Sequence, residues 1–110
     1  MINDTMARIE NMIKNSGHIT EENKAIYLEL LKTLGKEISE LSKTQEEQAV
    51  SISGFTKVST HEAIREEKNS ELMNISLKGL QSSVEGFEVS NPNLVSIVNS
   101  ICSFLSNLGI

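Results

Sequence analysis

The chain has 110 residues, 38% of them hydrophobic, and a formal net charge of −5, so we expect a single domain (1–110) with a modest core. An acidic surface repels phosphate groups, which argues against nucleic acid and disfavours anionic membranes. The single cysteine, Cys102, excludes an intramolecular disulfide and suits a reducing compartment. No apolar stretch is long enough to span a membrane and Met1–Asp4 shows no signal peptide, so we expect a cytoplasmic protein.

The composition favours helices, because the chain contains only one proline and six glycines and is rich in Leu, Ile, Glu and Lys. The first predicted helix covers about 3–15. Its apolar residues recur at helical spacing: Ile2, Met6, Ile9 and Ile13. Gly17 follows the helix and can adopt the left-handed conformation that ends one.

A second helix is predicted over 20–44. Thr20 is suited to cap its start, and Glu21 and Glu22 follow in the first turn, where the helix dipole favours carboxylates. One face is apolar throughout: Tyr27, Leu31, Leu34, Ile38 and Leu41. We expect this face to be buried.

The pattern weakens over 45–59, which we predict to be a connector between helices. Its first half is polar, and Val50–Val58 alternates only partly between apolar and polar residues. This segment is compatible with a short strand or an irregular loop, and a lone strand needs a pairing partner, such as its copy in another subunit.

A third helix is predicted over 60–89. Its main apolar face consists of Met73, Leu77, Leu80, Val84 and Phe87. A second uncharged face includes Leu72, Ile75, Gly79 and Gly86. Glycine inside a helix costs about 1 kcal/mol relative to alanine, so close approach of a neighbouring backbone is one candidate reason for these glycines. A helix with two packable faces indicates association.

The last predicted helix covers 92–108. Asn91 caps it, Pro92 occupies its first position, and Gly109 is expected to end it. Its apolar face consists of Leu94, Val98, Ile101, Leu105 and Leu108. The opposite face has only small neutral side chains, and either it is exposed to solvent or another helix packs over it.

No combination of residues predicts catalysis or metal binding, so we expect no enzymatic activity, no cofactor and no catalytic, cofactor-binding or metal-binding residue. Cys102 lies beside Ile101 on an apolar helix, as a small buried hydrophobic residue does. His18 and His61 belong to no recognisable ligand pattern, and a charged solvent face explains Glu62 and its acidic neighbours better than a cation site.

The C-terminal residues resemble a small bacterial family known only as a domain of unknown function (catalogue number four-four-zero-four). The resemblance rests on Phe87-Glu88, on Ser90–Leu94, where Asn91 stands in place of the usual histidine, and on the closing Leu105–Ile110. The leucine-rich stretch Tyr27–Leu41 fits the family's earlier helix, and the match covers about half of the chain. It implies a short, cytoplasmic helical protein and assigns no functional residue.

These patterns predict an all-α, oligomeric protein whose two longer helices form an antiparallel hairpin with two shorter helices packed against it, resembling a coiled coil or four-helix bundle. We expect a homodimer, with these residues at its interface: Leu72, Ile75, Gly79, Gly86, Leu94, Val98, Ile101, Leu105 and Leu108. The expected function is a non-enzymatic interaction or adaptor module. The alternative is a protein that docks onto another protein or a membrane surface through its uncharged C-terminal helix.

Overall fold

The computed structural model describes residues 1–108, which form five α-helices and no strand. The helices are α1 (Ile2–Lys14), α2 (Glu21–Ser42), α3 (Glu46–Ile64), α4 (Ser70–Ser83) and α5 (Pro92–Leu108). The predicted all-α class is confirmed. The predicted end of the last helix at Gly109 and the final Ile110 lie outside the described residues.

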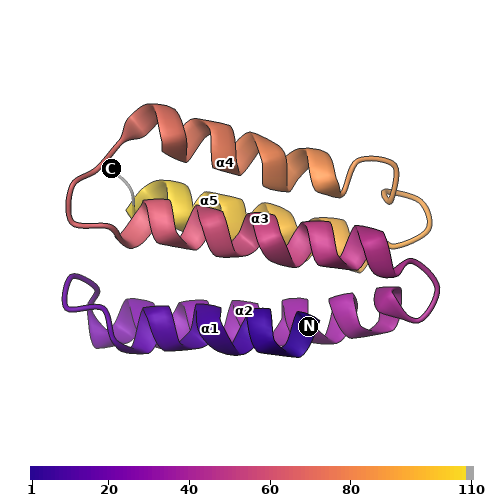
Figure 1. Cartoon of the computed structure of the whole chain (residues 1–110), viewed down its shortest axis with the longest axis horizontal. Helices are drawn as coiled ribbons and strands as arrows, with labels where there is room; N and C mark the ends of the chain where they lie inside the picture. Colours follow the sequence, from indigo (N-terminus) through magenta and orange to yellow (C-terminus); the bar gives the residue numbers. More distant parts are fainter. Residues whose placement is uncertain (109–110) are drawn as a thin grey trace.

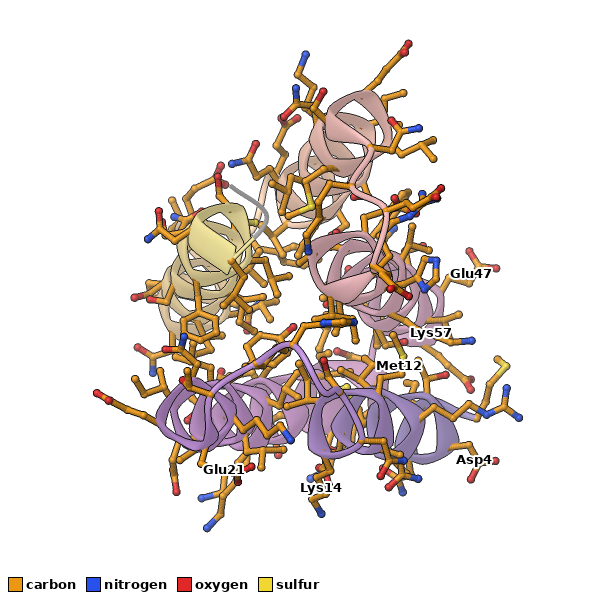
Figure 2. The ribbon with its side chains drawn as sticks, turned by 90° about the vertical axis from the view of Figure 1, so that its left-hand side faces the viewer. Asp4, Met12, Lys14, Glu21, Glu47 and Lys57 are labelled. Atoms are coloured by element: carbon orange, nitrogen blue, oxygen red, sulfur yellow. The ribbon has the colours of Figure 1, made fainter. Side chains whose placement is uncertain are left out.

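The five helices run side by side along the long axis of a molecule that measures 37 × 25 × 21 Å (Figure 1). Helices α1 and α2 form one layer, α3 and α5 form the next, and α4 lies on the far side of α3 and α5 (Figures 1 and 2). Helix α3 contacts all four other helices, whereas α4 contacts only α3 and α5. The centre of the fold is therefore α3.

The first two helices form as their sequences predict. The hydroxyl of Thr20 accepts a hydrogen bond from the backbone N–H of Asn23 at 3.1 Å and caps α2. The predicted apolar face of α2, from Tyr27 to Leu41, is buried over its whole length. The buried residues of α1 are Met6, Ile9 and Ile13, and they pack against α2 and α3. With α3, α2 makes the antiparallel hairpin of the two longest helices.

The predicted connector at 45–59 is wrong, because this segment is most of α3. The buried face of α3 is largely polar and includes Ser53, Thr56, Ser59 and Thr60. Thr56 donates to the carbonyl oxygen of Ile52 and Thr60 donates to that of Thr56, each at 2.7 Å. Such bonds within the helix satisfy hydroxyl groups in the core. They also explain the error, since a buried face made of serine and threonine has no apolar period.

The predicted continuous helix over 60–89 is also wrong. Helix α3 ends at Ile64, and α4 begins only at Ser70. The ammonium group of Lys68 donates to the carbonyl oxygen of Ala63 near the end of α3, and the side chain of Asn69 accepts from the backbone N–H of Leu72 at 3.0 Å. These two contacts satisfy backbone groups that a continuous helix would have paired internally.

The segment after α4 is a turn rather than helix. Gly86 lies in this turn with a φ of +92°, a left-handed conformation that favours glycine. The prediction that Gly86 lies on a helix face is therefore corrected. Phe87 still packs into the core from the turn.

The Tyr27 side chain links the layer of α1 and α2 to the layer of α3 and α5. Its oxygen lies 2.6 Å from Oγ1 of Thr60, and both side chains are fully buried. Because the Thr60 hydroxyl already donates to the carbonyl oxygen of Thr56, Tyr27 is the donor in this bond. The Tyr27 ring also stacks on Phe104, with centroids 5.4 Å apart and planes inclined by 8°. One tyrosine thus connects α2 to both α3 and α5.

Ser59 is the exception on this polar face, because its buried hydroxyl oxygen has no hydrogen-bond partner in the described part of the chain. We expect Ser59→Ala to raise the free energy of unfolding by about 1 kcal/mol, since the substitution removes an unsatisfied buried hydroxyl and alanine favours the helix. Urea denaturation measures the change. Ser53→Ala is the matched control, because the Ser53 hydroxyl donates to the carbonyl oxygen of Val50 at 2.9 Å. A less stable Ser59→Ala variant would contradict the expectation.

Candidate interaction surface

Four large apolar side chains are exposed on neighbouring helices. Phe55 (40% exposed) and Val58 (48%) project from α3, and Leu72 (43%) and Ile75 (58%) project from α4. We call these four residues, with Gly79 between the helices, the α3/α4 patch. The exposed apolar area is on the order of 300 Å², the size of the largest apolar patch on a typical monomer, and such a patch is often functional.

Gly79 fixes the register of the patch. A Cβ atom at this position would lie within 3.0 Å of three ring carbons of Phe55, so the ring occupies the space that a larger residue would fill. The two helices are antiparallel and joined by a short loop. Phe55 opposite Gly79 therefore places Val58, one turn later in α3, opposite the turn of α4 that carries Ile75. The predicted close approach at Gly79 is real, but its partner is a side chain of the same subunit.

Charged residues lie around the patch. Glu71 and Lys78 are exposed on α4 and are seven residues apart, so they project from the same side of the helix at the two ends of the apolar stretch. At the loop end, the guanidinium group of Arg65 donates to Oε1 of the buried Glu62 at 2.9 Å. The patch thus has an apolar centre and a polar rim, as protein interfaces do.

The predicted interface residues of the last helix lie elsewhere. Their side chains are at most 1% exposed within a single subunit: Leu94, Val98, Ile101 and Leu105. They pack against α2, α3 and α4 and are not available to a partner in this fold, so their assignment to an interface between subunits is corrected. Leu108 is partly buried against the same core.

The structure brings together only part of the predicted interface. Leu72, Ile75 and Gly79 lie in the patch, but Phe55 and Val58 were not predicted because their segment had no helical apolar period. The spacing of uncharged residues could have identified them. Ser51, Phe55 and Val58 recur at helical spacing, as do Leu72, Ile75 and Gly79.

The uncharged outer face of α5 is exposed, which answers the question that the sequence left open for a single subunit. Its exposed side chains are Ser96, Asn99, Ser100, Ser103, Ser106 and Asn107. Part of this face lines an open hollow together with Glu88 and Pro92. The lining residues hold no cluster of ionisable groups, and nothing in their chemistry identifies a ligand.

The residues that could react chemically are dispersed. Cys102 is buried in α5, and burial raises the pKa of its thiol to about 11. His18 and His61 are both exposed and lie on different segments. Within residues 1–108, no three histidine, cysteine or acidic side chains gather where they could hold a metal ion. No helix in this part of the chain is long and apolar enough to cross a membrane.

The raised pKa values of Cys102 and Tyr27 make the free energy of unfolding depend on pH in the alkaline range. Burial also raises the pKa of the Tyr27 hydroxyl well above its usual range, and its hydrogen bond to Thr60 only partly offsets the effect. The unfolded chain releases both protons at lower pH than the folded chain. We therefore expect the free energy of unfolding to fall as the pH rises above about 9. Urea denaturation at several pH values measures this slope. A slope that Tyr27→Phe and Cys102→Ala together leave unchanged would contradict the explanation.

The contact between Gly79 and Phe55 predicts that Gly79→Ala has opposite effects on the free energy of unfolding when Phe55 is present and when it is replaced by alanine. Gly79→Ala should lower the free energy of unfolding by about 1 kcal/mol, because displacing the Phe55 ring costs more than the helix gains. In a Phe55→Ala background, the same substitution should raise it by about 1 kcal/mol. Gly54→Ala is the control, since its Cβ would meet no atom within 4 Å, and it should be stabilising in both backgrounds. Thermal denaturation of the wild-type protein and the five variants tests the contact, and equal effects of Gly79→Ala in both backgrounds would contradict it.

Comparison with known proteins identifies a family. A model of the family described as "Domain of unknown function (DUF4404)" matches residues 27–110. No curated protein and no solved structure matches the chain. The family match confirms the resemblance drawn from the C-terminal residues, and it includes all of α3, α4 and the α3/α4 patch but not α1. The match covers well over half of the chain, so this all-helical protein belongs to the DUF4404 family.

Proposed function

We propose that this protein is a non-enzymatic interaction module that associates with itself through the α3/α4 patch. The observation that supports this proposal is the gathering of Phe55, Val58, Leu72 and Ile75 on one face. The other large apolar side chains that are exposed among the described residues belong to other segments: Met1, Ile26 and Val89. Burying four large apolar side chains per subunit would supply the driving force for association.

The chemistry of the core supports a non-enzymatic role. A nucleophilic cysteine needs a lowered pKa and a neighbouring base, whereas the pKa of Cys102 is raised and the shift comes from burial alone. The buried hydroxyl groups of α3 that are bonded donate to carbonyl oxygens of their own helix. These groups serve to pack a polar helix face, and none is arranged as a nucleophile with its base.

The alternative function, docking through the apolar side of the last helix, has less support. Leu94, Val98, Ile101 and Leu105 would have to leave the core before they could contact a partner protein or a membrane. Exposing four such side chains costs roughly 6–12 kcal/mol, comparable with the whole stability of a small domain. The α3/α4 patch needs no such rearrangement.

Ile75→Asp tests the proposal. The substitution places a charge at the centre of the patch in both subunits of a dimer, and we expect it to weaken the dimer by at least 100-fold. Folding should be unaffected, because the side chain is 58% exposed in the subunit. Light scattering measures the molar mass, and therefore the association, at protein concentrations up to the submillimolar range. Circular dichroism checks the fold.

Ile26→Asp is the matched control. Ile26 is an exposed isoleucine in α2, a helix that does not contact α4. The expected result is a dimer for the wild-type protein and for Ile26→Asp, and a folded monomer for Ile75→Asp. A wild-type protein that stays monomeric at every concentration would overturn the proposal, as would a dimer that only Ile26→Asp dissociates.

A further inference from the structure

We infer that the two subunits meet with their α4 helices antiparallel across a two-fold axis close to Ile75, so that Glu71 of each subunit pairs with Lys78 of the partner subunit. This inference rests on the proposed self-association and specifies its geometry. It follows from the positions of two charges on α4 and from the shape of the patch.

Glu71 and Lys78 are placed symmetrically about the apolar centre of α4. They are two helical turns apart, which separates them by about 10 Å along the axis, and both lie on the side of the helix that carries Ile75. Both are exposed, and within residues 1–108 neither takes part in an ion pair. The midpoint between them falls beside Ile75. Among residues 1–108, each charge therefore lacks an ion-pair partner, and each marks one end of the apolar stretch.

This placement selects one orientation of two copies. If α4 packs parallel to the α4 of the partner, Glu71 meets the partner's Glu71 and Lys78 meets the partner's Lys78. If the helices are antiparallel, each carboxylate meets an ammonium group, and the two pairs are related by the two-fold axis, as an isologous interface requires. Ile75 then packs against the partner's Ile75, at the centre of the interface.

Helix α3 completes the surface on each side of the paired α4 helices. Phe55 packs over Gly79, and Val58 is exposed one turn later in α3, so the partner's α4 can contact both helices of the hairpin. The face is about 21 Å long, from the 14 residues of α4, and about 20 Å wide for two adjacent helices. Two such faces bury on the order of 1,000 Å² in total, which is below the area of stable interfaces and in the class of weak, transient ones. A dimer of this size dissociates readily, and its affinity is sensitive to two ion pairs.

Charge reversal tests this geometry without touching the apolar centre. Glu71→Lys gives the patch of each subunit only positive ends, and Lys78→Glu gives it only negative ends. Each single variant should dimerise roughly tenfold more weakly than the wild-type protein at low ionic strength. An equimolar mixture of the two should recover the wild-type affinity as a heterodimer, because every carboxylate again meets an ammonium group. Sedimentation equilibrium at low salt measures the four dissociation constants, for the wild-type protein, the two variants and their heterodimer, and high salt should bring them together.

The matched control uses the same charges at the same spacing on another helix. Glu29 and Lys36 are exposed on α2, seven residues apart, and α2 does not contact α4. Glu29→Lys, Lys36→Glu and their mixture should all dimerise as the wild-type protein does. If Ile75→Asp dissociates the dimer but Glu71→Lys and Lys78→Glu each dimerise as tightly as the wild-type protein, the antiparallel geometry is overturned while self-association through the patch stands. A mixture tighter than the wild-type protein would then indicate parallel α4 helices. A wild-type monomer overturns both.

Discussion

The whole fold depends on one unusual helix face, the buried row of serine and threonine residues in α3. Hydroxyl groups in a core are costly unless they are hydrogen-bonded, and Ser53, Thr56 and Thr60 meet this requirement with carbonyl oxygens of their own helix. These side chains are small, so neighbouring helices can approach α3 closely. This explains how one helix of ordinary length contacts all four others. Tyr27 then adds the one buried side-chain bond that ties α2 to this row.

The sequence predicts the helices whose buried residues are aliphatic and misses the one whose buried residues are polar. Each residue of the predicted apolar face of α2 is buried, and so is most of that of α5. In α3 the amphipathic pattern is the weakest of the five helices, although Ala49, Ile52 and Ala63 are fully buried. Apolar periodicity detects burial only when burial requires apolar residues. In α3 local hydrogen bonds remove that requirement, so the position of the helix could not be read from hydrophobicity.

The break between α3 and α4 escapes prediction for a different reason. Residues 65–69 contain neither glycine nor proline, and arginine, glutamate and lysine all favour helix. The helix is interrupted there, where the Lys68 side chain donates to the carbonyl oxygen of Ala63 and Asn69 caps the following helix. Each contact is common at helix ends, but lysine is also common inside helices, and asparagine, although it favours caps, occurs there too. The break follows from a tertiary preference for two short antiparallel helices over one long one, and that preference is not a property of the local sequence.

An apolar stripe in the sequence predicts that a helix face packs, but it does not predict what covers that face. The second uncharged face of α4 and the apolar stripe of α5 are both predicted to lie at an interface, yet Leu94, Val98, Ile101 and Leu105 are covered by their own chain, whereas Leu72 and Ile75 remain exposed. The difference lies in the neighbours: α5 lies between α2, α3 and α4, and α4 lies at the edge of the bundle with contacts to α3 and α5 only. Periodicity indicates that a face packs, but only the order of the helices decides whether the covering surface belongs to the same chain. Helix α1, which lies outside the family match, sharpens this point, since it packs against α2 and α3 and makes no contact with α4 (Figure 2). The additional helix leaves the α3/α4 patch open, and the patch lies wholly within the part of the chain that the family model matches.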